Sequence, residues 1–257
     1  MKVVFENVNV YSGKRKIIED FNLEVNREFI SIYGNNGSGK STLVKVLMGL
    51  YNFDGNIFID DIAFNKDTTD MMEKRLSFLL KDYDDVIVAE TVFDEIAFPL
   101  ENLGRTVDHI KKDVETIADR LGISDLLERV PHELSLNNRN LVALASALVS
   151  KPDILIIDNM LSEFNLEVID YIKGLNITVI NFTSNSEECL YGDRIAILDK
   201  GKIVLNNNKE DFFEDIDLVK KYMRLPFIVD LSNRLRFYDL IDKIYFDEEK
   251  LVDDLWK

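Results

Sequence analysis

The sequence predicts an α/β fold with a mostly parallel core sheet. Short apolar runs rich in β-branched residues recur along the chain as buried strands do, at 29–33, 76–80, 155–157, 177–182 and 194–198. From Glu90 to about Ser150, apolar residues recur at helical spacing. A glycine-rich loop also joins the first of these strands to a helix-like segment at Leu43–Met48. Strands that alternate with helices favour a parallel sheet covered by helices.

The two ends of the chain differ from this core pattern. Near the N-terminus, Val3–Tyr11 and Ile17–Val25 alternate polar and apolar residues, and Asn56–Asp60 forms a third short run of this kind. This alternation predicts β-strands. Near the other end, Asn206–Asn208 is expected to be a polar break before a helical, acidic appendage at residues 209–257.

Composition limits the classes of function. The chain has 257 residues, 46% of them hydrophobic, which suits one large domain or a core with an appendage. Its formal net charge of −16 disfavours nucleic acid and anionic lipid as primary partners. Cys189 is the only cysteine, which fits a reducing cytosol. We see no signal peptide and no apolar stretch of ~20 residues, so any membrane role is expected to act through a partner.

A complete phosphate-binding loop (P-loop) is the most specific motif. The pattern G-x-x-x-x-G-K-[ST] is met by Gly34, Asn35, Asn36, Gly37, Ser38, Gly39, Lys40, Ser41 and Thr42. The glycines let backbone N–H groups turn inward around phosphate oxygens. Lys40 is predicted to reach the β- and γ-phosphates, and the Ser41 hydroxyl to bind Mg²⁺. A strand before the loop and a helix after it are the context that the motif requires, so we predict nucleotide binding.

An acidic residue, Asp158, ends the apolar strand at 155–157. Magnesium-dependent nucleotide hydrolysis needs an acid in such a place to hold the ion, directly or through water. The alternative is that Asp158 only terminates a buried strand. The P-loop upstream favours the metal role.

The order of these segments resembles that of an ATP-binding-cassette (ABC) transporter ATPase subunit. The matching segments are Gly34–Thr42, Leu134-Ser135, Ile154–Asp158, Asp193-Arg194 and Asp199–Val204. The resemblance implies a P-loop NTPase fold with an N-terminal antiparallel β subdomain and a helical signature subdomain at about residues 90–140. It also places Tyr11 against the adenine ring of ATP, where it would stack. The alternative for Tyr11 is an ordinary strand aromatic.

Further segments narrow the resemblance to energy-coupling-factor (ECF) transporter ATPases, which import vitamins and transition-metal ions in prokaryotes. These segments are Asp84–Val92, Glu95–Gly104, Leu225–Leu231 and Asp247–Val252. The resemblance implies a nucleotide-binding domain at 1–208 and a C-terminal helical, dimerisation-type extension at 209–257. It implies ATP and Mg²⁺ as cofactors. The implied partners are a second ABC ATPase subunit, a membrane-embedded coupling protein and a substrate-binding membrane subunit. The implied location is cytoplasmic, on the inner face of the cell membrane.

Three positions that carry hydrolysis in this family hold other residues here. Asn159 stands where the family has its catalytic glutamate, and an amide cannot take a proton from the attacking water. General-base help is typically worth ~10²–10⁴-fold in rate. Ser184 stands where the family has its switch histidine, and Lys81 where it has a glutamine close to Mg²⁺. The charge of Lys81 repels that ion.

The signature loop is also altered. The family has Leu-Ser-Gly-Gly-Gln, and this chain has Leu134-Ser135-Leu136-Asn137-Asn138. Ser135 can still cap a helix and face a phosphate of the partner's nucleotide. Leu136 and Asn137 place side chains where glycines let the backbone approach that nucleotide. Because the P-loop is intact, these changes predict retained ATP binding with slow or partner-dependent hydrolysis.

Two alternatives to such a degenerate importer subunit stay open. One is an active importer ATPase with unusual catalytic groups. The other is a nucleotide-binding switch or scaffold that regulates a partner without energising transport. Relatives of this family that act on nucleic acid fit poorly, because the chain is acidic and has no basic stripe.

Overall fold

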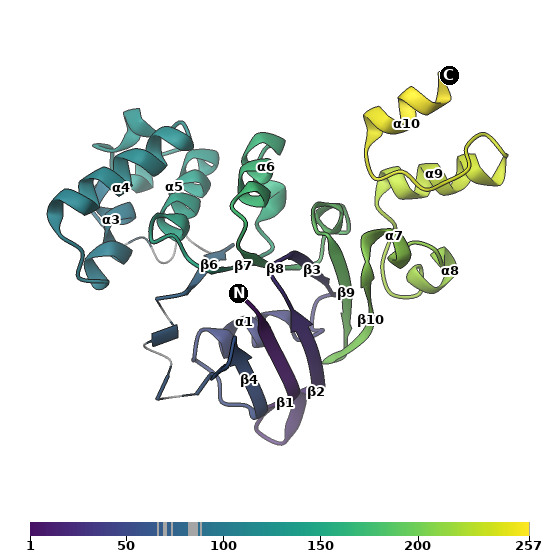
Figure 1. Cartoon of the computed structure of the whole chain (residues 1–257), viewed down its shortest axis with the longest axis horizontal. Coiled ribbons are helices and arrows are strands. Elements are labelled where there is room, and N and C mark those ends of the chain that lie inside the picture. Colours follow the sequence, from purple (N-terminus) through teal and green to yellow (C-terminus); the bar gives the residue numbers. More distant parts are fainter. Residues whose placement is uncertain (66, 69–70, 73, 82–86, 88, 257) are drawn as a thin grey trace.

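The computed structural model describes residues 1–65, 67–68, 71–72, 74–81, 87 and 89–256, which fold around two sheets (Figure 1). The larger sheet has the strand order β10-β9-β3-β8-β7-β6. Its strands are β3 (Phe29–Tyr33), β6 (Leu76–Leu80), β7 (Ile154–Asp158), β8 (Thr178–Thr183), β9 (Arg194–Asp199) and β10 (Lys202–Asn208). The smaller sheet has the order β2-β1-β4-β5, with β1 (Val3–Ser12), β2 (Arg15–Val25), β4 (Asp54–Ile59) and β5 (Ile62–Ala63).

The centre of the larger sheet is parallel. Strand β3 pairs with β8 and β9, β7 pairs with β8, and β6 pairs with β7, all in the parallel sense. In this register Tyr33 lies opposite Thr183, and Asp158 lies between Leu80 and Phe182. The carboxyl ends of β3, β7 and β8 therefore meet at one edge of the sheet. In open α/β sheets this is the edge where ligands bind.

One prediction about this sheet was wrong. Asn206–Asn208 do not break the chain but continue β10, where they pair with Ala196, Ile195 and Arg194 of β9 in the antiparallel sense. β10 is the edge strand, and its exposed side tolerates a run of polar side chains.

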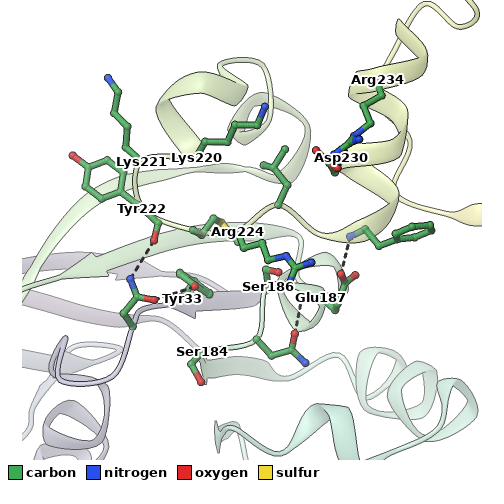
Figure 2. A pocket seen from close by; sticks show the side chains of 15 residues that line it. Tyr33, Ser184, Ser186, Glu187, Lys220, Lys221, Tyr222, Arg224, Asp230 and Arg234 are labelled. Atoms are coloured by element: carbon green, nitrogen blue, oxygen red, sulfur yellow. Dashed lines mark hydrogen bonds and ion pairs between the residues drawn. The ribbon is translucent and has the colours of Figure 1, made fainter. Parts of the chain in front are cut away.

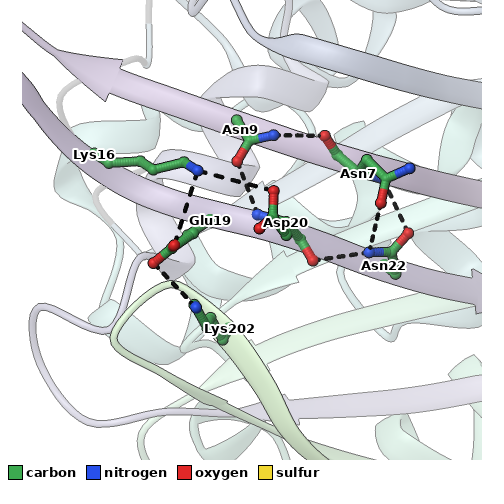
Figure 3. Close-up of polar contacts among 7 residues, drawn as sticks. All are labelled: Asn7, Asn9, Lys16, Glu19, Asp20, Asn22 and Lys202. Atoms are coloured by element: carbon green, nitrogen blue, oxygen red, sulfur yellow. Dashed lines mark hydrogen bonds and ion pairs between the residues drawn. The ribbon is translucent and has the colours of Figure 1, made fainter.

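The smaller sheet is antiparallel, with β1 pairing irregularly with β2. Asn7 and Asp20 have positive φ of 48° and 47° where the register shifts. The Asn22 Oδ1 accepts the backbone N–H of Asn7 at 2.9 Å, and the Asn9 Oδ1 accepts that of Asp20 at 2.8 Å (Figure 3). The asparagine side chains thus take the place of missing ladder hydrogen bonds. Helix α1 (Lys40–Leu47) shares one apolar core with both sheets.

The segment expected to be helical forms three long helices, α3 (Val92–Asn102), α4 (Val107–Arg120) and α5 (Leu136–Val149). Short 3₁₀ turns at Ser124–Leu126 and Pro131–Glu133 connect α4 to α5. These helices and α6 (Leu166–Gly174) bury one core against the larger sheet. In the segment Asp84–Val92, singled out in the sequence, residues 84–86 and 88 lie outside the described residues.

The C-terminal extension forms α7 (Lys209–Phe212), α8 (Ile216–Val219), α9 (Phe227–Phe237) and α10 (Glu248–Leu255), on the side of the molecule opposite α3–α5 (Figure 1). Its apolar residues share a core with Tyr33 of β3 and with Ile195 and Ile197 of β9. The division at residue 208 remains a prediction, and this core crosses it. Within the described residues, no helix has both the length and the apolar character needed to cross a bilayer.

Candidate functional site: a P-loop beside an Asn–Ser pair

The predicted P-loop lies between the end of β3 and the start of α1, at the carboxyl edge of the larger sheet. Gly39 precedes α1 with φ of 115°, a conformation that L side chains rarely adopt. A Cβ atom at Gly39 would lie 2.4 Å from the Ile18 Cδ1, and one at Gly34 would lie 2.7 Å from the backbone oxygen of Leu198. Glycine is therefore required here by the path of the backbone and by its close neighbours.

The turn between β9 and β10 is hydrogen-bonded to the P-loop. The Gly201 N–H donates to the backbone oxygen of Ser38 at 2.9 Å, and the Gly201 oxygen accepts the Glu19 N–H at 3.0 Å. A Cβ atom at Gly201 would lie 2.2 Å from the backbone oxygen of Ile17. This glycine thus joins the P-loop to the hairpin of β1 and β2.

Two polar side chains of the loop are buried. The Lys40 ammonium donates to the backbone oxygen of Gly34 and, at 3.3 Å, to that of Asn35. Burial lowers the pKa of Lys40, and the negative charge of Asp158 opposes that shift. The hydroxyl of Ser38 is buried without a hydrogen-bond partner among the described residues.

A pocket of about 330 Å³ opens over the loop. Its lining consists of Arg15, Ile17, Asn36, Gly37, Gly39, Lys40, Ser41, Thr42 and Asn159. Sequence reasoning missed Arg15, the first residue of β2 after the hairpin turn, for which the only local signal is its positive charge. Tyr11 does not line this pocket; it is 51% exposed at the end of β1, with the Lys16 Nζ 6.0 Å from its ring centroid. The adenine-stacking role of Tyr11 stays a prediction.

Asn159 and Ser184 form a hydrogen-bonded pair next to Asp158. The Asn159 Nδ2 donates to the Asp158 Oδ1 at 2.8 Å. The Asn159 Oδ1 accepts the Ser184 backbone N–H at 2.8 Å and the Ser184 hydroxyl at 3.0 Å. Asn159 has φ of 52°, a left-handed conformation that asparagine tolerates better than most residues. The amide oxygen therefore uses both lone pairs on Ser184.

Comparison with known proteins decides the family, because the profile of the ABC transporter family matches residues 18–162. The chain belongs to the ABC transporter family. Its relatives include the ECF transporter ATP-binding protein EcfA1 of Mycoplasmoides gallisepticum, 30% identical over 94% of this chain and 95% of the relative. EcfA1 of Streptococcus pneumoniae is 33% identical over 98% of this chain and 94% of the relative.

Solved structures agree with the expected fold. The structure of cbiO1 from Clostridium perfringens, part of the ABC transporter complex cbiONQ, matches with a TM-score of 0.76 and 25% identity. That match covers 93% of this chain and 98% of cbiO1. An ABC transporter cassette in its ADP conformation matches with a TM-score of 0.73 and 22% identity over 86% of this chain and 98% of the other, which supports the fold alone. The predicted P-loop ABC ATPase fold is confirmed.

The residues of this ABC chain fit ATP with Mg²⁺. The left-handed glycines Gly37 and Gly39 and the buried Lys40 ammonium line the pocket over the loop and suit phosphate oxygens. Ser41 and Asp158 offer a hydroxyl and a carboxylate, and Mg²⁺ prefers such oxygen ligands. Lys81 directly follows Leu80, the strand partner of Asp158, and is exposed at the same sheet edge.

The altered signature loop of this ABC chain begins α5. Ser135 is its N-cap, and the Ser135 hydroxyl accepts the Asn138 N–H at 3.3 Å. Leu136 is 55% exposed, and Asn137 lines a separate pocket of about 300 Å³ with Phe164. None of the four residues from Ser135 to Asn138 lines the P-loop pocket of its own chain.

The segment after Ser184 carries two acids that sequence reasoning missed. Glu187 is exposed, and its Oε1 accepts the Phe227 N–H of the extension at 2.7 Å. Glu188 is 1% exposed, and its carboxylate oxygens accept the Ser162 N–H at 3.0 Å and the Asn181 amide at 3.4 Å. The segment is thus hydrogen-bonded both to the loop after β7 and to the extension.

Proposed function

We propose that this chain is the ATP-binding subunit of an ECF-type importer, in which it binds MgATP and hydrolyses it slowly or only with a partner. The observation that carries the proposal is an intact P-loop cradle beside an Asn159 amide already committed to Asp158 and Ser184. The names of its curated relatives support the transport role.

The backbone N–H groups of Gly34–Thr42 would surround the phosphates, and the Lys40 ammonium would turn from its backbone acceptors to the β- and γ-oxygens. Ser41 and Asp158 would hold Mg²⁺, which neutralises phosphate charge. Arg15 lines the same pocket and adds a second positive charge. Tyr11 is half-exposed, so it could stack on adenine without leaving a core.

Hydrolysis would be slow because no group at the pair can act as a strong base. Asn159 has no ionisable oxygen, and the Ser184 hydroxyl donates its proton to Asn159. A glutamate and a histidine would supply a proton acceptor and a cationic donor to the γ-phosphate. The expected loss of general-base help is ~10²–10⁴-fold.

The second ABC ATPase subunit, in a homo- or heterodimer, would complete each nucleotide site. Residues Ser135, Leu136, Asn137 and Asn138 would face the nucleotide of that subunit, and the extension at 209–257 would support the dimer. A membrane-embedded coupling protein and a substrate-binding membrane subunit would complete the importer for a vitamin or metal ion. The chain would then lie in the cytoplasm, peripheral to the inner face of the membrane.

The second candidate is a nucleotide-binding switch or scaffold that does not energise transport. The hydrogen-bonded Asn159–Ser184 pair favours this second candidate, because a chain that binds ATP without cleaving it can act as a clamp. Purification of the tagged chain from its native membrane separates the two candidates. Recovery with a second ATPase and integral membrane proteins supports the importer, whereas recovery with soluble proteins alone supports the switch.

Nucleotide binding itself is tested by titrating the chain with a fluorescent ATP analogue and Mg²⁺. Lys40→Ala should weaken binding ~10–100-fold, since hydrogen bonds to charged groups are worth about 1.5–3 kcal/mol. Lys45→Ala is the matched control, because Lys45 lies on the same helix but is exposed, and it does not line the pocket. Equal affinities of the wild type and Lys40→Ala would refute the assigned role of the loop.

A further inference from the structure

A second, larger pocket of about 910 Å³ lies between the C-terminal extension and the segment that follows β8 (Figure 2). Its walls come from Tyr33 and Asn35, from residues 184–187, and from extension residues between Lys220 and Arg234. Its volume lies within the range of small-molecule sites, about 300–1,000 Å³. It shares no lining residue with the pocket over the P-loop.

Cations without a carboxylate partner distinguish this pocket. Arg224 reaches from the extension toward Ser186 and Glu187, and Lys220 and Lys221 line another part of the pocket (Figure 2). Within the described part of the chain, neither Arg224 nor Lys220 forms an ion pair.

The two acids of the pocket wall are already engaged. Asp230 forms an ion pair with Arg234 at 2.9 Å, and the Glu187 carboxylate accepts the Phe227 N–H at 2.7 Å. The lining holds four cations, Lys220, Lys221, Arg224 and Arg234, against these two carboxylates. On a chain with a net charge of −16, this local excess of positive charge marks a preference for anions.

Hydrogen bonds join this pocket to the P-loop. The Tyr33 hydroxyl donates to the Asn35 Oδ1 at 3.2 Å, and the Asn35 Nδ2 donates to the backbone oxygen of Tyr222 at 3.4 Å. Ser184 lines the second pocket and is hydrogen-bonded to Asn159, which lines the pocket over the P-loop. A ligand between the extension and residues 184–187 would therefore contact groups that are tied to the nucleotide site.

We propose that this pocket binds a small, soluble, multivalent anion that carries phosphate groups, and that its occupancy alters the affinity of the P-loop for ATP. The planar Arg224 guanidinium offers a two-pronged donor that matches phosphate oxygens. Lys220 adds a second positive charge. The effect on ATP affinity rests on the proposed function, whereas anion binding in the pocket does not.

Inorganic pyrophosphate is the probe for the anion site. Calorimetric titrations are made in the Lys40→Ala background, which weakens phosphate binding at the P-loop. Arg224→Ala/Lys220→Ala should weaken pyrophosphate binding at least about tenfold, and Arg224→Lys should give an intermediate affinity because it keeps the charge without the fork.

The matched control is Arg236→Ala/Lys250→Ala, which removes the same charge from the extension outside the pocket. This control should bind pyrophosphate with the same affinity as the Lys40→Ala chain. No binding of pyrophosphate by Lys40→Ala, or an equal loss of affinity in the control and in Arg224→Ala/Lys220→Ala, would overturn the anion site. Matching thermal unfolding curves verify that every variant is folded.

A second titration measures the affinity of the otherwise wild-type chain for a non-hydrolysable ATP analogue, with and without pyrophosphate. Pyrophosphate competes with the analogue at the P-loop equally in both proteins. A difference between wild type and Arg224→Ala/Lys220→Ala in the change of affinity that pyrophosphate causes therefore reports binding in the second pocket. Couplings between sites are typically about fivefold or more. A difference of that size supports regulation, and identical behaviour overturns it. Failure of the analogue to bind at all would refute the proposed function and leave the pyrophosphate result standing.

Discussion

Replacement of Glu188 by glutamine should make the protein more stable. The Glu188 carboxylate is 1% exposed, and the described residues provide it with two hydrogen-bond donors but no cation. The Asn181 Oδ1 beside it is buried without a partner. In Glu188→Gln, the new amide oxygen would still accept the Ser162 N–H. If the Asn181 amide turns over, the new NH₂ group can donate to the Asn181 Oδ1.

The magnitude follows from the groups that change. An unsatisfied buried acceptor costs about 1–3 kcal/mol, and burying a carboxylate without a cation adds to that cost. The new amide loses part of the charge-assisted bond to Ser162, so we expect a net gain of about 1–2 kcal/mol. For a protein of this size, each kcal/mol raises Tm by about 2–4 °C.

Urea unfolding of the nucleotide-free chain measures this gain as a higher midpoint with an unchanged slope. Glu187→Gln is the control, because Glu187 is exposed and the amide keeps an acceptor for Phe227; its stability should change by less than about 0.5 kcal/mol. Glu188→Leu should lose about 1–3 kcal/mol, since the Ser162 N–H would be left unpaired. A Glu188→Gln variant less stable than the wild type would show that the carboxylate is favourably solvated, and the reasoning would be wrong.

Three other outcomes follow from the site and its surroundings. Gly39→Ala should weaken ATP binding more than tenfold, as measured by equilibrium titration, because its Cβ would meet Ile18 in a backbone conformation strained for alanine; unchanged affinity would contradict this. Burial raises the pKa of the Cys189 thiol, so the folded thiol stays protonated at a pH where the unfolded one ionises. Stability should therefore fall above about pH 8.5, by up to about 1.4 kcal/mol per pH unit, and Cys189→Ala should remove that slope in unfolding titrations. Asn159→Glu/Ser184→His should raise ATP turnover at least about tenfold in a phosphate-release assay. The same change should lower the free energy of unfolding by about 1–3 kcal/mol, because the hydrogen bond from the Asn159 amide to Asp158 is lost. No gain in rate would place the defect in the signature loop.

Local sequence signals were sufficient for the centre of the fold. The strands around Tyr33 and Asp158 are apolar runs whose interpretation does not depend on neighbours, and the P-loop motif fixes both the turn and the helix after it. The parallel register then brings Asp158 and Ser184 to the edge where the P-loop lies. These parts were predictable because the spacing of apolar residues and the P-loop motif are each contained within a few consecutive residues.

The parts that were missed depend on contacts between distant residues. Asn206–Asn208 form a strand only because β9 offers backbone partners. Glu188 contacts Ser162, and Glu187 contacts Phe227, across separations that no periodicity reports. Helix α6 does carry a local signal, because Asn165 caps it by accepting the Val168 N–H.

The core shared by the extension and the larger sheet has a consequence for synthesis of the chain. Ile195 and Ile197 of β9 are covered by residues that extend as far as Leu251. At about 5–20 residues per second, more than fifty residues follow Ile197 over roughly 3–10 s before that cover is complete. During this interval a nascent chain exposes the apolar face of β9 to solvent. The last fifth of the chain therefore determines how long each new copy is exposed to aggregation.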